Sequence, residues 1–339
     1  MLARSTIAAA LALPLIIGGA LFAASRSGGD PAGPAPAVAL ATADTTPDAL
    51  DSTVPVDTML PTPSWPGLSA TAIGELAELQ AAVRGLDTPA KARAAGFRPV
   101  LGWIPTMGTH WVSEDRMRAG FQRDAPDHLM FSPVGDTQRL VGIAYAYWDS
   151  SDAVLPDAFD GTLDTWHEHP ELAPEGQTLI MLHVWFSPSM DGPFAGHNPW
   201  LPYWAAQLDG PDPRWLRTAQ DTVVARKAGL AIGEAVAPSG FAVLAERRGD
   251  LGANADRARF AVRKLIPALR AAREAGDRAG WLTTARQAAA SWDEIRSAYL
   301  TAAKPYPDAY EQLARFLGEM ETGAHAGHVD AHDEHAGHD

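Results

Sequence analysis

The chain has 339 residues, 46% hydrophobic and 20% charged, a composition typical of a soluble globular protein with room for one large domain or two moderate ones. It contains no cysteine, which excludes disulfides, thiolate ligands and cysteine nucleophiles and leaves histidine, carboxylate and methionine as metal ligands. The net charge is −14 and is concentrated in residues 1–211, so we expect no nucleic-acid partner, whereas metal cations remain possible ligands.

The first 25 residues have the pattern of a secretory signal. Arg4 precedes the apolar run STIAAALALPLIIGGALFAAS, and small residues around Ala23 and Ser25 offer a cleavage site. The sequence therefore predicts export to the periplasm or the extracellular space. The run is about 20 residues long, so an uncleaved membrane anchor through residues 5–24 is the alternative.

Residues 26–66 hold eight prolines among Ala, Thr, Asp and Gly, which predicts a flexible linker. Order is expected from Ser69, the N-cap of a helix with Leu68 and Ile73 as a hydrophobic staple. The buried face of this helix is predicted from the apolar spacing of Ile73, Leu76, Leu79 and Val83. A second short helix should begin after Thr88 and end at Gly96.

The period then changes to that of strands. Residues 139–148 (RLVGIAYAYW) and 178–187 (TLIMLHVWFS) are apolar runs rich in β-branched and aromatic residues, which favours two buried strands of one sheet. Residues 99–105 and 128–135 are expected to add further strands. Residues 67–211 are therefore predicted to form an α+β domain with a mixed α/β sheet.

Residues 212–323 are predicted to form a helical bundle packed beside the sheet, with helices at 214–228 and 239–248 among others. Another helix is expected after an Asn254 cap, with a kink at Pro267. Two further apolar seams have helical spacing and predict core positions: Trp281, Ala285, Ala288, Trp292, Ile295 and Tyr299, then Tyr310, Leu313, Leu317 and Met320 before a stop at Gly323.

Sequence signatures of common enzymes, such as G-x-S-x-G, the P-loop, G-x-G-x-x-G and H-E-x-x-H, do not occur in the chain. Chemistry is expected instead from histidines in the sheet domain. A shared zinc or copper site is predicted from histidines at turns and strand ends of a cysteine-free exported domain. The candidate ligands are His110, His167, His169 and His183, with His197 next.

His167 and His169 are two residues apart on an extended segment, so they should point the same way, with Glu168 opposed. His183 should share a face with Leu179, Met181 and Trp185, where a hydrogen-bonded core histidine is the alternative to a ligand. His128 is expected on the surface. Four acids could orient a ligand or act as a base, or could simply be solvated: Glu114, Asp160, Asp164 and Glu168.

The stretch SPSMDGPFAGHNPWLPYW is rich in turn residues and aromatics. We interpret it as a packed corner beneath the helical bundle. The alternative is a loop that lines a cleft.

The segments GWIPTMGTHW, LVGIAY, FDG and LHVWF followed by DGPFAGHNP resemble a set of uncharacterised bacterial exported proteins. That set has a glycine-histidine-aromatic turn, an LVGVEY-like strand, and an LHVW strand followed by an N-P-x-G-x-F-A-x-x-N-P loop. The resemblance covers roughly residues 90–200, places His110, His183 and Asn198 on the shared pattern and implies no particular reaction. The chain departs from the pattern at PSMDG, where Asn-Pro is usual.

Residues 324–339 form a histidine-rich tail, HAGHVDAHDEHAGHD after Ala324. With Val329 as its only large apolar residue, it is predicted to be disordered in the absence of metal. We interpret it as a flexible arm that captures copper, zinc or nickel, and a merely solubilising tail is the alternative. The candidate ligands of the arm are His325, His328, His332, His335 and His338.

Three functions are therefore open. The first is an exported metal-binding or metal-handling protein with a site in the sheet domain and a capture arm. The second is a metal-dependent hydrolase or oxidoreductase of the cell envelope, with an open coordination position near His110 and His183. The third is a non-catalytic envelope scaffold whose bundle binds a protein partner that the sequence does not identify.

Overall fold

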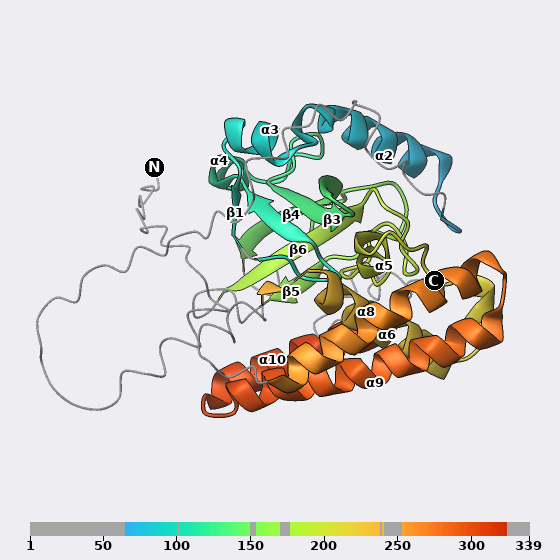
Figure 1. Ribbon diagram of the computed structural model, residues 1–339. Coiled ribbons are helices and arrows are strands. Elements are labelled where there is room, and N and C mark those ends of the chain that lie inside the picture. Colours follow the sequence, from blue (N-terminus) through green and yellow to red (C-terminus); the bar gives the residue numbers. More distant parts are fainter. Residues whose placement is uncertain are drawn as a thin grey trace, which may run out of the picture.

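The computed structural model describes residues 65–100, 102–149, 154–169, 177–237, 239–240 and 253–323. The predicted signal or anchor, nearly all of the linker and the histidine-rich tail lie outside the described residues. A central sheet is covered by short helices on one side and by long helices on the other (Figure 1). Among the described helices, none combines the length and the apolar character needed to cross a bilayer.

One antiparallel sheet contains all six named strands, in the order β1-β2-β3-β4-β6-β5. The strands are β1 (Arg98–Pro99), β2 (Thr109–Val112), β3 (His128–Val134), β4 (Thr137–Asp149), β5 (His167–His169) and β6 (Thr178–Trp185). The two apolar runs predicted as buried strands correspond to β4 and β6, which pair directly, so that prediction is confirmed. Residues 128–135 also form a strand, whereas 99–105 contributes only β1 and a bridge between Ile104 and Gly108.

Two short helices precede the sheet, and each has the N-cap residue that the sequence predicted. In α2 (Ala70–Ala82) the Ser69 hydroxyl accepts a hydrogen bond from the backbone N–H of Ala72, and in α3 (Pro89–Ala94) Thr88 does the same for Lys91. The predicted buried face is wrong at one position. Ile73 is 45% exposed, because the face that meets the sheet passes through Ala72, Leu76 and Leu79 instead.

The long helices are α6 (Ala219–Val236), α8 (Ala253–Glu274), α9 (Arg278–Ala303) and α10 (Pro307–Thr322). Every member of the predicted seam from Trp281 to Tyr299 is buried, which confirms the seam. In α10, Leu317 and Met320 are buried but Tyr310 is 38% exposed. The helix α8 already begins at Ala253, so Asn254 is not its cap, and Pro267 lies inside it.

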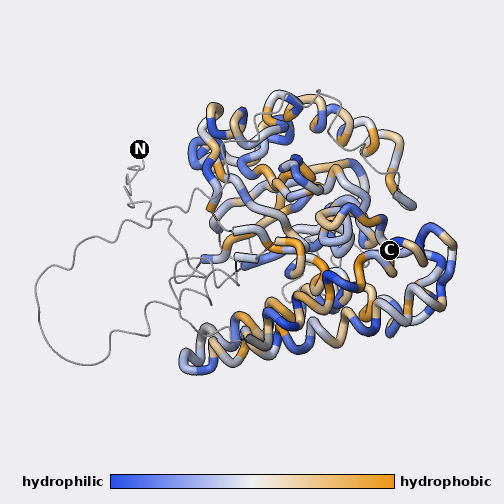
Figure 2. The backbone as a smooth tube through the Cα atoms, viewed as in Figure 1, coloured by the Kyte–Doolittle hydropathy of each residue, from blue (hydrophilic) through white to orange (hydrophobic). Residues whose placement is uncertain are grey.

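Apolar and polar stretches alternate along the long helices at the bottom of the view (Figure 2). The apolar seams account for this pattern. The core of the bundle also includes Ile104 and Met107 from the loop before β2, and Tyr203 from α5 (Leu201–Ala205). Side chains from the region before residue 211 therefore pack in the core of the bundle. The boundary at residue 211 stays a prediction.

A buried charged cluster interrupts the apolar core of the bundle. The Tyr299 hydroxyl donates to Glu234 Oε2 at 2.6 Å, and Arg259 Nη2 donates to the same oxygen at 3.2 Å. Burial raises the pKa of Glu234, and hydrogen bonds from Ser239 and Tyr299 together with the charge of Arg259 oppose that rise. These contacts join α6, α8 and α9 at one point.

Candidate metal centre

Five histidines from four strands share one face of the sheet. The strand registers place His128 opposite Ala144 and Ala144 opposite His183, which sets the two imidazoles on either side of β4. The alternation of side chains along each strand brings the others to the same face. The five rings, here called the histidine cluster, belong to His110, His128, His167, His169 and His183.

Small residues of the central strand leave room for these rings. On the histidine face, β4 presents Gly142, Ala144 and Ala146, while its large side chains Ile143 and Tyr145 belong to the core on the other face. A Cβ atom at Gly142 would lie 2.6 Å from the carbonyl oxygen of Val184 and 2.7 Å from the methyl carbon of Met130. The absence of a side chain at Gly142 is therefore a packing requirement.

Replacing Gly142 by alanine should lower the free energy of unfolding by about 1–3 kcal/mol, because the added methyl group meets a backbone oxygen that cannot move freely. The measurement is urea denaturation followed by circular dichroism. Gly74→Ala in α2 is the matched control, since its added Cβ meets no atom within 4 Å. In a helix interior that change should stabilise the chain by roughly 0.5–1 kcal/mol. Equal stability of Gly142→Ala and the wild type would contradict the close packing.

The histidine cluster is buried. Relative exposures are 4% for His110, 6% for His128, 1% for His167, 5% for His169 and 0% for His183. The prediction that His128 lies on the surface is therefore wrong. The hydrophilic DAPD segment before it suggested a loop, but the residue opens β3 and is covered on both sides by neighbouring strands.

Neighbouring rings in the cluster lie at short, regular distances. The ring centroids of His110 and His183 are 5.5 Å apart, those of His183 and His167 are 5.0 Å apart, and those of His167 and His169 are also 5.0 Å apart. His128 lies 6.1 Å from His110. The cluster is thus continuous from β3 to β5, and the pair His167 and His169 points to one side as the spacing predicted.

The closest approach joins the Nε2 atoms of His110 and His183, which are 3.4 Å apart. Two nitrogens bound to one tetrahedral zinc ion, each at about 2.0–2.1 Å, lie roughly 3.3–3.4 Å from one another. The pair therefore has the spacing of two ligands of a single ion. As a direct hydrogen bond, 3.4 Å is beyond the usual N–H···N range.

Hydrogen bonds at the opposite ring nitrogens set the tautomers. His183 Nδ1 lies 2.8 Å from the carbonyl oxygen of Gly196, which can only accept, so the proton belongs on Nδ1. The Nε2 atom of the neutral ring then carries a lone pair that faces His110. A metal-binding histidine commonly has such a backbone partner at its second nitrogen.

His128 has a carboxylate partner. Its Nδ1 atom hydrogen-bonds to Asp127 Oδ1, and both oxygens of Asp127 also accept from the backbone N–H of Ala146, at 3.1 and 3.2 Å. The carboxylate is thereby fixed to β4 and fixes the ring of His128 in turn. Sequence reasoning missed both residues, although the adjacent Asp-His pair before an apolar run was the available signal.

Burial, together with the smaller effects of the nearby His128 and His169, lowers the pKa of His110 to about 3. The ring is therefore neutral near pH 7. Its Nδ1 atom is buried and has no hydrogen-bond partner among the described residues, which leaves a polar atom in the cluster unsatisfied.

Among the described residues, no three histidine, aspartate or glutamate side chains already stand together as a group able to hold a metal ion. Two ring nitrogens therefore have the spacing of metal ligands, and a third ligand is not in place in this arrangement. His167 is the nearest candidate for that third ligand, because its ring lies beside that of His183.

His197, predicted as a further ligand, lies at a different place. Its Nδ1 atom is 3.1 Å from the Thr106 hydroxyl, and its ring is 5.8 Å from that of Phe316 in α10. It is 2% exposed and occupies the junction between the sheet and the bundle. These contacts of His197 are with the loop before β2 and with α10, and its role as a ligand stays a prediction.

The four acids named as candidates are engaged in other contacts or point elsewhere. Glu114 forms ion pairs with Arg98 and Arg118, both at 3.7 Å. Asp160 accepts a hydrogen bond from Ser69, and Asp164 accepts one from the backbone of Ala158. Glu168 alternates with His167 and His169 along β5, as predicted. Within the described part of the chain, Asp127 is a carboxylate that contacts the cluster, through His128.

The stretch at 187–204 is a packed corner, as predicted. The Asn198 side chain donates to the Ser187 hydroxyl at 2.9 Å and to the Pro188 carbonyl at 3.1 Å, and its oxygen accepts from the N–H of Trp200. Both His197 and Asn198 are buried. The rigid corner holds the Gly196 carbonyl against His183.

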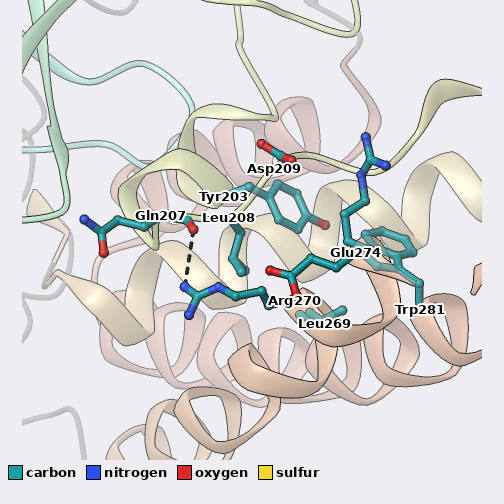
Figure 3. A pocket seen from close by; sticks show the side chains of 9 residues that line it. Tyr203, Gln207, Leu208, Asp209, Leu269, Arg270, Glu274 and Trp281 are labelled. Carbon is teal, nitrogen blue, oxygen red and sulfur yellow. Dashed lines mark hydrogen bonds between the residues drawn. The ribbon is translucent and has the colours of Figure 1, made fainter. Parts of the chain in front are cut away.

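A separate recess lies where α5 meets α8 and α9, and Figure 3 shows its lining. No histidine lines it. Arg270 donates to the backbone carbonyl of Gln207 at 3.3 Å, and Arg273 donates to that of Gly210 at 3.0 Å. Because these cations already bind backbone oxygens, the recess is a structural junction, and the histidine cluster remains the candidate site.

Comparison of the chain with protein-family models, with curated proteins and with solved structures found no match.

Proposed function

We propose that this protein is an exported metal-binding protein that holds zinc or copper in the histidine cluster. The single observation that carries the proposal is the 3.4 Å separation of the Nε2 atoms of His110 and His183, with the second nitrogen of His183 bonded to a backbone carbonyl. Two buried imidazole nitrogens at this spacing, one of them oriented by a backbone carbonyl, suit one metal ion. The ion would link the side chains of β2 and β6 across the histidine face of the sheet.

Burial favours metal handling over catalysis. A catalytic ion needs a position open to substrate or water. In the histidine cluster the most exposed ring is that of His128, at 6%, and Trp185 packs beside His183 with ring centroids 6.0 Å apart. An ion held here would be shielded from solvent, which suits storage or transfer. We therefore favour metal handling over the enzyme and scaffold alternatives.

In this proposal the tail captures metal ions and the histidine cluster retains them. Residues 325–339 carry five histidines, whose imidazoles suit copper, zinc and nickel, and four acids that add negative charge near them. A chain exported through residues 1–25 would meet free or weakly bound metal outside the cytoplasm. Separating the two functions experimentally requires a full chain whose tail cannot bind metal. We call the chain with alanine at all five tail histidines the tail-silent chain.

The test is metal content after equilibrium dialysis against micromolar zinc or copper. The tail-silent chain is expected to retain close to one ion per molecule. The same chain with the additional changes His110→Ala and His183→Ala is expected to retain none. His197→Ala is the matched control, because that histidine is equally buried but lies at the sheet–bundle junction. Retention of metal by the double variant, or its absence from the tail-silent chain, would contradict the proposed site.

A further inference from the structure

We infer that the ion held in the histidine cluster is copper in its cuprous form, with at least one methionine thioether completing the imidazole ligands. The inference rests on the proposed function and specifies its metal. It starts from two methionines, Met130 and Met181, that share the histidine face of the sheet.

Each methionine is paired with a histidine of the cluster across neighbouring strands. Met130 in β3 is directly opposite His110 in β2, and Met181 in β6 is directly opposite His167 in β5. Residues opposite one another in an antiparallel pair have Cβ atoms about 4.5–5.5 Å apart, so their side chains are neighbours on that face. The two methionines thus occupy the positions directly opposite the first and third histidines of the series from His110 to His167.

Both methionines are buried. Met130 is 0% exposed and Met181 is 5% exposed. Met130 extends over β4, since its methyl carbon is the atom that a Cβ on Gly142 would meet at 2.7 Å. Met181 packs with Ala144 and Ala146, the small residues that leave room for the rings. Methionine has three flexible side-chain bonds, so a thioether here can turn toward an ion without moving the backbone.

The chemistry of this ligand set favours cuprous copper. Thioether sulfur is a soft ligand that selects Cu(I), whereas zinc prefers thiolate, imidazole and carboxylate. The chain has no cysteine to supply thiolate. Imidazoles and thioethers are neutral, so the charge of the ion is not cancelled by its ligands, and burying one positive charge costs less than burying two. The carboxylate of Asp127 contacts His128 and offers partial compensation to a single charge.

The experiment compares Cu(I) and Zn(II) binding by the tail-silent full chain, each in competition with a chromophoric chelator, with ascorbate present for copper. We expect Cu(I) to bind more tightly than Zn(II). Met130→Leu or Met181→Leu should weaken Cu(I) binding by about tenfold or more and leave Zn(II) binding unchanged. Met320→Leu is the matched control, because Met320 is 1% exposed but lies in the bundle core. Leucine for methionine preserves volume, and circular dichroism melts verify that each variant is folded.

The outcomes separate this inference from the proposed function. Tighter binding of zinc, or unchanged Cu(I) affinity in both methionine variants, overturns the copper assignment and leaves the metal site standing. Binding of neither ion overturns the proposed function itself. X-ray absorption of the copper-loaded chain supplies an independent measurement: a sulfur neighbour supports the inference, and a shell of nitrogen alone contradicts it.

Discussion

Replacing His183 by alanine in the tail-silent chain should lower the melting temperature more strongly with metal present than after chelation. Two effects contribute. The first is independent of metal: the variant loses a fully buried ring and its hydrogen bond to Gly196, on the order of a few kcal/mol. The second exists only with metal, because an ion that binds the folded chain stabilises it by about 4 kcal/mol at a thousand times its dissociation constant.

The measurement is a set of four thermal melts, of parent and variant with saturating metal and with chelator. His197→Ala again provides the control, since it removes a buried histidine and should give the same shift under both conditions. Equal shifts for His183→Ala under the two conditions would assign that residue a purely structural role as a core histidine.

Replacing Arg259 by methionine should destabilise the chain by about 3–5 kcal/mol, because it leaves the buried Glu234 carboxylate without its cation. Burial already raises the pKa of Glu234, and removal of Arg259 should raise it further. The folded variant then holds a proton that the unfolded chain has released above its ordinary pKa, so stability falls as pH rises. The loss should therefore be greater at pH 8 than at pH 5.

Urea denaturation at the two pH values measures this effect. Arg118→Met is the control, since it removes an arginine from exposed ion pairs with Glu114 and Asp115 and should leave stability nearly unchanged. The double variant Glu234→Gln/Arg259→Met should recover much of the lost stability, because no buried charge then remains. A loss for Arg259→Met that is independent of pH would contradict the account.

The part of the site that could be predicted is the part that depends on local periodicity. Alternation along 178–185 placed Leu179, Met181, His183 and Trp185 on one face, and all four are buried. The i and i+2 spacing likewise placed His167 and His169 together. These inferences need only the two-residue repeat of a strand.

The remainder of the site depends on contacts that the linear sequence does not encode directly. His128 joins the cluster because β3 pairs with β2 on one side and with β4 on the other, and a strand start after DAPD gives no local sign of this register. His197 contacts Thr106 and Phe316, which are 91 and 119 positions away in the chain. These two contacts depend on the tertiary packing and leave no sign in the local sequence.

The packed corner also has a structural consequence. Gly196 and His197 are consecutive: the carbonyl of the first fixes the ring of His183, while the side chain of the second rests on Phe316 of α10. The same two residues therefore contact both the sheet and α10, the helix that precedes the histidine-rich tail in the chain.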